Sequence, residues 1–340
     1  MKKALCLTAA SVLLVTFFSA DLFAAPFYQG KTLRINVGTS PGGGFDLWVR
    51  VVARHLGKHI PGNPTVLVEN IPGAGHLIMT NQFAKTVKPD GLTIAHINGG
   101  LILAQMLGEP GYDFDPQKFI YLGAVNKENS VIVLSKKTGI TSVETWRASK
   151  VPVQLGGTAP GNSADNNARL VKMVLGLPAQ IVTGYKGTLD CLVAMDSGEL
   201  DGTPASWDTV RINRRKALET GDLVIVLQSV AKPIKAIAKV PRFYDAAKTD
   251  EQKKIIEIVS HQFNDYSRPY AAPPGTPMDR VDILRKALRE VTTDKEFLGE
   301  LEKSQFNLDY TSAEELTAAV AASTKQDAAM KAKLREVLFK

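Results

Sequence analysis

The residues best suited to chemistry lie in glycine-rich loops that follow short strand-like runs. The first loop, SPGGGFD at residues 40–46, separates the alternating run at 32–38 from a segment with helical apolar periodicity. A helix N-terminus carries unpaired backbone N–H groups and about half a positive charge, so it can bind an anion without a basic side chain. Glycine has no Cβ, which lets a ligand approach the backbone closely and permits positive φ. The loop therefore predicts an anion site.

Two more loops have the same character. IPGAGH at residues 71–76 follows the run TVLVEN, and the glycine pair at 99–100 follows GLTIAHIN. A single glycine-rich loop is a weak signal, but three such loops after three strands indicate a cleft for an anion or another polar ligand. His76, which ends the second of these loops, could donate a hydrogen bond to that ligand.

Polar side chains near these loops have two alternative roles. Asp46 can accept a backbone N–H and cap the helix that follows, or its carboxylate can face the ligand. The stretch ASWD leaves the same choice open for Ser206 and Asp208. Lys186 can pair with an anion or lie in solvent.

Aromatic residues divide between cleft and core. Phe45 and Tyr185 lie in loops and are candidates for an aromatic wall of the cleft. Trp48 falls on the apolar stripe of a helix and is expected in the core, while Trp207 follows a strand-like segment and is a further candidate for the cleft.

The sequence argues against nucleotide binding and catalysis. The first loop lacks the Gly-Lys-Ser/Thr of a P-loop and the G-x-G-x-x-G of a dinucleotide site. His55 and His59 lie four residues apart, a spacing compatible with metal binding, but H-E-x-x-H is absent and a helix surface accounts for them. No G-x-S-x-G elbow is present. We expect a protein that is not an enzyme and uses no cofactor and no metal ion.

Length and composition are those of a large globular protein. The 340 residues are 44% hydrophobic and 22% charged, which is enough for a sizeable core and two domains. The formal net charge of +7 slightly favours anionic ligands, but the basic residues are too dispersed to indicate binding to nucleic acid.

The start of the chain predicts a secretory signal peptide. Two lysines precede an apolar run, and small residues follow, so we expect cleavage near Ala24 or Ala25 and export of the mature chain. The apolar run is short for a membrane span, which needs about 20 residues. An uncleaved anchor is the alternative, because Leu22 stands where a small residue is preferred. After cleavage Cys191 is the only cysteine, and its apolar context predicts a buried side chain without a disulfide.

Strand-like runs, glycine loops and helical segments succeed one another along the chain. VPVQLGG leads into NSADNNARLVKMVLGL, and AQIVTGY leads into KGTLDCLVAMDSG. This succession predicts an α/β fold with open, mostly parallel sheets. Ligands of such sheets bind beyond the carboxyl ends of the strands, where loops lead into helix N-termini.

Six stretches occur in the order SPGGGFDLWVR, VLVENIPGAGHL, KPDGLTIAHIN, GGTAPGNS, GYKGTLDCLVAMDSGELDG and AAPPGTP. Together they resemble the extracytoplasmic solute receptors of the tripartite tricarboxylate transporters, the Bug or TctC-like family. The resemblance extends from about Thr32 to Val320. Its most specific anchors are PGG with the following aspartate at 41–46, VEN with PGAG at 68–75, and PDG at 89–91.

The resemblance implies a two-domain periplasmic binding protein of type II-like architecture. Each domain would be a mostly parallel sheet flanked by helices, with the ligand cleft between the domains. We expect a signal peptide at 1–25, a discontinuous domain 1 at 26–124 and 233–340, and domain 2 at 125–232. The stretches YLGAVN and VLQSVA would form the hinge strands.

The resemblance also implies a function. Such a receptor captures a small organic acid in the cleft and delivers it to the membrane permease subunits of a tripartite tricarboxylate-type transporter, and it is expected to be a monomer. The alternative is a ligand-sensing receptor on the same scaffold that feeds a two-component signalling system.

The family's binding mode carries over to residues of both domains. Two glycine loops would hold the ligand carboxylate through backbone groups and bridging waters, and GGTAPGNS and GYKG would contact it from the other domain. The candidate ligand-binding residues are Ser40, Gly42, Gly43, Gly44, Phe45, Asp46, Gly73, Ala74, Gly75, His76, Gly157, Thr158, Ala159, Ser163, Tyr185, Lys186, Ser206 and Asp208.

This chain departs from the family's pattern in the second domain. The usual motif is Gly-Thr/Ser-x-Gly-x-Gly-Ser followed by a histidine, whereas Pro160, Asn162 and Asn166 stand here, with Thr158 and Ser163 matching. The sequence is therefore that of a divergent member, and the identity of the acid does not carry over.

Overall fold

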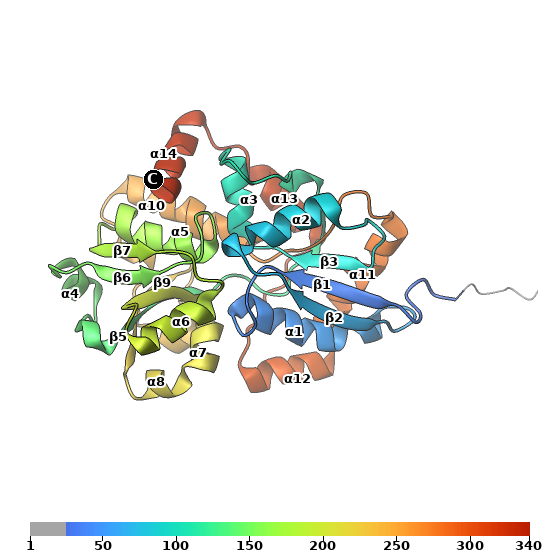
Figure 1. The fold of residues 1–340 in the computed structure, drawn as a ribbon, viewed down its shortest axis with the longest axis horizontal. Helices are drawn as coiled ribbons and strands as arrows, with labels where there is room; N and C mark the ends of the chain where they lie inside the picture. The colour runs from blue at the N-terminus through green and yellow to red at the C-terminus, as the bar shows by residue number, and fades with distance from the viewer. Residues whose placement is uncertain (1–24) are drawn as a thin grey trace, which may run out of the picture.

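The computed structural model describes residues 25–340, so the predicted signal peptide lies outside the described residues except for its last position. Two five-stranded sheets lie side by side along the long axis of the molecule, and each has helices on both faces (Figure 1). The α/β fold with two domains that the sequence predicts is confirmed.

The first sheet has the strand order β2-β1-β3-β10-β4. Its strands are β1 (Thr32–Val37), β2 (Thr65–Asn70), β3 (Thr93–His96), β4 (Ile120–Gly123) and β10 (Tyr270–Ala272). β1 pairs in parallel with β2 and β3, whereas β10 runs antiparallel to both β3 and β4. The sheet is therefore mixed, and its three parallel strands end at the same edge.

Helices cover both faces of the first sheet because side chains alternate along a strand. Ile94 packs in one core with Trp48, while its neighbour Ala95 packs in another with Phe83. The helices of the first face are α1 (Gly44–Leu56), α11 (Met278–Val291) and α12 (Lys295–Ser304), and those of the second are α2 (Leu77–Thr86), α3 (Gly99–Met106) and α13 (Ala313–Ser323). Trp48 is 1% exposed, as its place on the apolar stripe of α1 predicts.

The second sheet has the order β7-β6-β8-β5-β9 and is also mixed. β6 pairs in parallel with β7 and β8, and β5 runs antiparallel to β8 and β9. Its strands are β5 (Ser130–Ser135), β6 (Val153–Gly156), β7 (Ala179–Val182), β8 (Gly202–Ser206) and β9 (Leu223–Ser229).

The helices around the second sheet also form two layers (Figure 1). One layer holds α6 (Thr188–Ser197), α7 (Trp207–Asn213) and α8 (Arg215–Glu219), and the other holds α5 (Ser163–Arg169), α9 (Phe243–Ala246), α10 (Asp250–Ile256) and α14 (Ala328–Phe339). α4 (Val143–Arg147) lies at the far end. Short 3-10 turns are η1 (Gly57–His59), η2 (Ala74–His76), η3 (Pro116–Lys118), η4 (Lys136–Thr138), η6 (Lys235–Ile237) and η8 (Gln262–Tyr266), and η5 (Leu170–Val174) and η7 (Glu257–His261) are π-helical.

Within the described residues the chain passes between the two sheets at three places. The first connects β4 to β5, the second connects η7 to η8, and the third connects α13 to α14. The predicted boundaries keep all of residues 233–340 with domain 1, but Ile256 of α10 and Leu338 of α14 pack in the core of the second sheet with Leu155. Amphipathic periodicity shows that a helix has a buried face, but it does not show which sheet that face covers.

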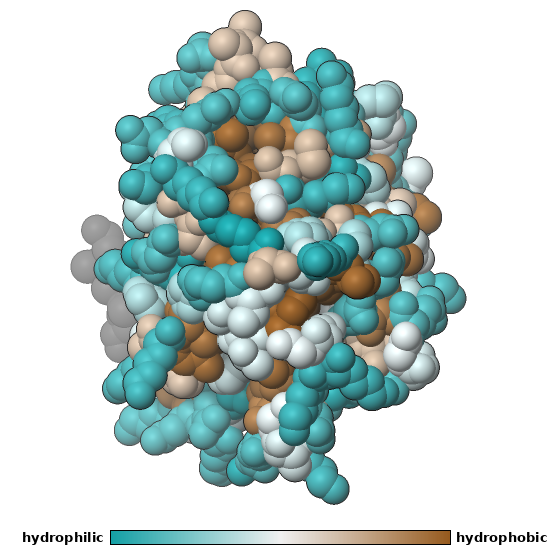
Figure 2. Space-filling model, turned by 90° about the vertical axis from the view of Figure 1, so that its left-hand side faces the viewer, coloured by the Kyte–Doolittle hydropathy of each residue, from teal (hydrophilic) through white to brown (hydrophobic). Residues whose placement is uncertain are grey.

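The surface at the end of the molecule formed by the second sheet is mainly hydrophilic. Figure 2 shows hydrophobic residues there in separate places between hydrophilic ones. In residues 25–340 no helix combines the length and the apolar character that crossing a membrane requires. Cys191 is buried on α6, and burial raises the pKa of its thiol to about 12, so the thiol is neutral at physiological pH.

The packing of α14 makes a prediction about stability. Leu334 is fully buried against the second sheet, so Leu334→Ala should lower the free energy of unfolding by about 2–5 kcal/mol. Glu336→Ala, at an exposed position of the same helix, should change it by less than about 0.5 kcal/mol. Denaturant unfolding of both variants measures the difference, and equal effects would contradict the assignment of α14 to this core.

Candidate ligand-binding site

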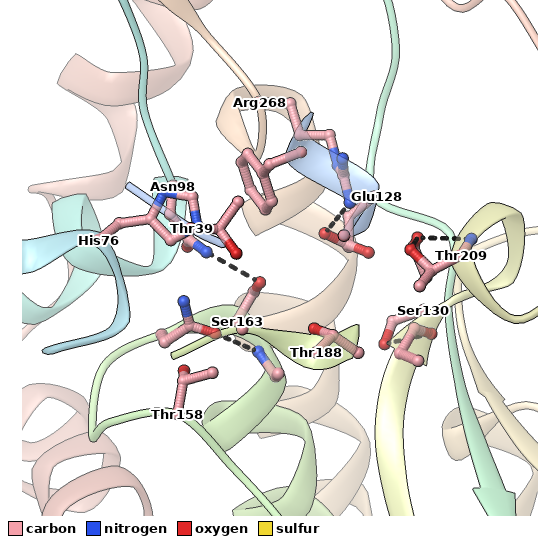
Figure 3. A pocket seen from close by; sticks show the side chains of 18 of the residues that line it. Thr39, His76, Asn98, Glu128, Ser130, Thr158, Ser163, Thr188, Thr209 and Arg268 are labelled. Atoms are coloured by element: carbon pink, nitrogen blue, oxygen red, sulfur yellow. Dashed lines mark hydrogen bonds and ion pairs between the residues drawn. The ribbon is translucent and has the colours of Figure 1, made fainter. Parts of the chain in front are cut away.

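A cleft lies between the two sheets and is lined by residues from both. Three lining residues follow the three parallel strands of the first sheet: Thr39 after β1, His76 after β2 and Asn98 after β3. Thr158 and Ser163, from the loop after β6 and the start of α5, line it from the other domain (Figure 3). In this closed conformation the free space in the cleft is about 30 Å³, enough for about two water molecules, so the binding of a small acid requires the lining to move outward.

Two helices from opposite sides begin at the cleft without a side-chain cap. α1 starts after Gly43 and α6 starts after Gly187, and both glycines line the cleft. α3, in contrast, is capped by Asn98, whose side chain accepts the backbone N–H of Gly100. The first-turn N–H groups of α1 and α6 are therefore available to an anion from two directions.

The carboxylate of Asp46 holds the first loop in place. Its Oδ2 accepts the backbone N–H of Gly42 at 2.8 Å and the Nε of Arg50 at 2.9 Å, and its Oδ1 accepts the amide of Asn70 at 2.8 Å. The side chain is buried and does not line the cleft. Asp46 therefore takes neither of the two roles that the sequence leaves open, because it does not cap α1 and does not line the cleft.

Ser206 and Asp208 also make structural hydrogen bonds. Ser206 Oγ accepts the backbone N–H of Thr209 at 3.2 Å, caps α7 and lines the cleft. Asp208 Oδ2 accepts from the indole of Trp48 at 3.1 Å and from the side-chain amide of Asn129 at 3.2 Å. The bond from Trp48 connects the two domains.

Glycines of both loops leave room for the opposite domain. A Cβ on Gly44 would lie 2.8 Å from Thr209 Oγ1, and a Cβ on Gly75 would lie 2.9 Å from Asn162 Cβ. Real Cβ atoms do not approach so closely, so these glycines permit the domains to meet. A Cβ on Gly43 would meet its nearest atom at 3.6 Å, which is ordinary contact.

The second loop has an unusual backbone. Gly73, Ala74, Gly75 and His76 all have positive φ, including φ values of 43° at Ala74 and 77° at His76. Such conformations are costly for residues other than glycine, so packing around the loop must hold them. The result is a buried His76 ring that contacts Phe45, with ring centroids 4.5 Å apart.

A buried ion pair at the cleft has no counterpart in the sequence analysis. Arg268 Nη2 donates to Glu128 Oε2 at 2.8 Å, and the two side chains are almost fully buried (Figure 3). The Arg268 guanidinium also lies over the ring of Phe45, with its central carbon 4.2 Å from the centroid. Arg268 lies three residues before AAPPGTP, and Glu128 lies between β4 and β5. The sequence gives no local signal of this pair, because Glu128 stands in the polar stretch NKENS and its partner lies 140 residues further along the chain.

Two buried histidines beside this pair are neutral at physiological pH. Burial, reinforced by the charge of Arg268, lowers the pKa of His76 to about 3, and the same causes hold the pKa of His96 well below its usual value. Nδ1 of His76 has no hydrogen-bond partner among the described residues. Arg268 is therefore the buried cation of the cleft, and exposed Lys186 lies at its edge.

The structure brings eight of the predicted residues into the lining of the cleft. These are Gly43, Gly44, Phe45, His76, Thr158, Ser163, Lys186 and Ser206. Outside the lining lie Ser40, Gly42, Asp46, Gly73, Ala74, Gly75, Gly157, Ala159, Tyr185 and Asp208. The candidate residues did not include Thr39, Asn98, Glu128, Ser130, Asn162, Ala164, Gly187, Thr188, Ala205, Thr209 and Arg268, although Asn162 and Gly187 lie in the predicted contact stretches GGTAPGNS and GYKG.

His55 and His59, on α1 and η1, contact α12 and the residue before it, and neither lines the cleft. Nε2 of His55 bonds to Glu300 at 2.8 Å, and Nε2 of His59 bonds to Asp294 at 2.9 Å. Lys58 Nζ lies 2.8 Å from the same Asp294 carboxylate, so a lysine pairs with this acid beside His59.

Two α/β domains with a polar cleft between them are the architecture of the periplasmic binding protein fold. The fold matches the periplasmic binding protein BugD with a TM-score of 0.74 at 20% identity, covering 91% of this chain and 98% of that one. MatC from Rhodopseudomonas palustris with bound malate matches with a TM-score of 0.71 at 17% identity, covering 91% and 99%. A protein of R. palustris with adipate matches with a TM-score of 0.72 at 19% identity, covering 91% and 97%.

The chain belongs to the tripartite tricarboxylate transporter family receptors, the TctC family, whose family profile matches residues 48–335. A UPF0065 protein of Bordetella bronchiseptica is 23% identical over 272 residues, which are 79% of this chain and 76% of the relative. The resemblance drawn from the motifs is confirmed, and so is the prediction of a solute-binding receptor. The family is extracytoplasmic, and the signalling alternative is not favoured.

The glycine contacts predict how the domains approach each other. Gly44→Ala should hold the domains apart, because its Cβ would overlap the buried hydroxyls of Ser206 and Thr209. Gly43→Ala, one residue earlier, should close normally. Small-angle scattering of the two variants without added ligand should give a larger radius of gyration for Gly44→Ala than for Gly43→Ala or the wild type, and identical values would contradict this account.

The buried histidines predict a pH dependence with a defined sign. The pKa of His76 is about 3 in the folded protein, against 6.5 for a free histidine, so below pH 6.5 the unfolded chain binds a proton that the folded chain does not. The free energy of unfolding should therefore fall from pH 7 to pH 5, by up to about 1.4 kcal/mol per pH unit for each such histidine.

The check is denaturant unfolding at the two pH values. His76→Asn, in which asparagine tolerates the left-handed backbone, should lose less stability on acidification than the wild type. The comparison is between the two pH dependences, so any loss of packing in the variant cancels. The same dependence in both proteins would show that His76 is not a neutral buried group.

Proposed function

We propose that this protein captures a small organic acid in the cleft and delivers it, chemically unchanged, to the membrane permease subunits of a tripartite tricarboxylate-type transporter. In this proposal it works in the periplasm as a monomer after removal of its signal peptide. The observation that carries the proposal is the convergence of two uncapped helix N-termini, α1 and α6, from opposite domains on one polar cleft.

The energetics explain why both domains take part. A charge at one helix N-terminus gains about 0.3–1 kcal/mol when exposed and up to about 2 kcal/mol when partly buried. A micromolar affinity requires about 8 kcal/mol. The remainder must come from hydrogen bonds to cleft side chains after closure has removed water. Thr158 is one donor for this purpose, because its hydroxyl is buried and has no partner among the described residues.

Direct hydrogen bonds across the cleft support a closed state of the two domains. Ser40 Oγ donates to Asp190 Oδ2 at 2.5 Å, and Asn162 Nδ2 donates to the Gly75 carbonyl at 3.2 Å. Ser40 and Gly75 belong to the two glycine loops of the first sheet, so these loops contribute to closure even where they do not line the cleft. A ligand that bridges α1 and α6 would favour this state over an open one, and a permease could recognise the closed shape.

Support for an acid ligand comes from two structures of the same fold. MatC is solved with malate and a second R. palustris protein is solved with adipate, and both ligands are carboxylates. The convergence of backbone N–H groups in this chain suits the same chemical group.

Thermal-shift and calorimetric measurements on the purified protein test the proposal. A panel of mono-, di- and tricarboxylates should contain acids that raise the melting temperature, since a ligand at 100 times its dissociation constant stabilises a protein by about 2.7 kcal/mol. Bound acid should be recovered unchanged and in stoichiometric amount. Stabilisation by amines or sugars with none by any acid would refute the carboxylate assignment, and turnover would refute the binding role.

A variant of Thr158 separates ligand binding from stability. Thr158→Val keeps the shape of the side chain and removes a buried hydroxyl that has no partner, so the ligand-free protein should not be destabilised. Affinity for the acid selected by the panel should fall about tenfold. Thr276→Val is the control, because Thr276 is equally buried but donates to Pro273 outside the cleft, and this variant should keep its affinity. Unchanged affinity in Thr158→Val would remove Thr158 from the site.

A further inference from the structure

Glu128 presents a hydrogen-bond acceptor to the cleft. Its backbone N–H is fixed by Asn264 Oδ1 at 2.8 Å and Ser267 Oγ at 3.0 Å, which sets its position between β4 and β5. Its Oε2 accepts from Arg268, while Oε1 makes no hydrogen bond to any of the described residues. The carboxylate lines the cavity (Figure 3), so Oε1 is open to a donor on the ligand.

Arg268 already interacts with Glu128 and Phe45, and the carboxylate of Glu128 offsets part of the positive charge that Arg268 presents to a ligand. Nη2 bonds to Glu128, and one face of the guanidinium lies over Phe45. Nε and Nη1 are buried without a partner among the described residues. The two opposite charges of the pair offset each other, and neutral His76 adds none. The cleft therefore has little net positive side-chain charge in its interior.

The remaining lining is rich in hydroxyl groups. They belong to residues on every side of the cavity: Thr39, Ser130, Thr158, Ser163, Thr188, Ser206 and Thr209. Phe45 supplies the large apolar surface among the lining side chains. Such a lining suits a ligand that carries polar groups along its length, because a plain alkyl chain would leave hydroxyls and Glu128 without partners.

We propose that Glu128 determines specificity by accepting a hydrogen bond from a hydroxyl or ammonium group of the ligand. The inference rests on the proposed function: the single carboxylate of the ligand lies at the N-termini of α1 and α6, and a donor group on the ligand reaches Glu128 Oε1. A second carboxylate at that place would meet the carboxylate of Glu128 and be repelled. The preferred substrate class is a hydroxylated or amino monocarboxylate, and unsubstituted dicarboxylates bind more weakly.

Matched acids of equal length test the proposal on the full mature protein. Calorimetry at pH 7 compares butyrate, 3-hydroxybutyrate, 3-aminobutyrate and succinate, with propionate, lactate, alanine and malonate as a shorter series. In at least one series a donor-bearing acid should bind about tenfold tighter than the plain acid and the diacid, since a hydrogen bond to a charged group has this strength. The hydroxy and amino acids of each series distinguish the two kinds of donor.

Glu128→Gln tests the assigned residue. Loss of the charge removes the repulsion and frees Arg268, so affinity for the diacid should rise about tenfold while the preference for the amino acid is lost. Glu109→Gln is the matched control, because Glu109 also pairs with an arginine, Arg335 at 2.9 Å, but lies outside the cleft. This control should keep the wild-type order of affinities.

The outcomes separate this inference from the proposed function. Tightest binding of the diacid by the wild type, or an unchanged order of affinities in folded Glu128→Gln, would overturn the role of Glu128 and leave acid binding intact. If no acid binds, both the proposed function and this inference fail. If Glu128→Gln does not fold, the order of affinities in the wild type decides alone.

Discussion

The structure depends on how closely the backbones of the two domains approach each other at the cleft. The N-terminus of α1 and the start of α7 meet where Gly44 contacts Ser206 and Thr209, and a single methyl group would separate them. This approach lets α1 and α6 direct N–H groups at one enclosed space. Enclosure strengthens the interaction of those groups with an anion, because water no longer competes for them.

Local features of the site could be predicted from the sequence, whereas its long-range pairings could not. SPGGGFD follows a strand and begins a helix as predicted, since both features depend on neighbouring residues. The pairing of Glu128 with Arg268 depends on tertiary contact between residues 140 apart. The same reason explains α14: its periodicity shows an apolar face, but the contact of Leu338 with the second sheet follows from the path of the chain.

The glycines illustrate how far a motif can be interpreted. Their lack of a side chain suggests space for a ligand, and Gly43 does line the cleft with room to spare. At Gly44 and Gly75 the space is filled by the other domain instead. The motif SPGGGFD thus contributes Gly43 to the binding surface and Gly44 to the contact between the domains. A sequence cannot show which neighbour fills the space beside a glycine.

The three passages of the chain between the sheets affect how the protein acquires its structure. Because α14 completes the core of the second sheet, that core lacks Leu334, Val337 and Leu338 until the last 12-residue helix has been synthesised. Contacts between segments so distant in sequence slow folding, since a long loop must close before they form. The second domain therefore completes its core only when nearly all of the described residues are available to it.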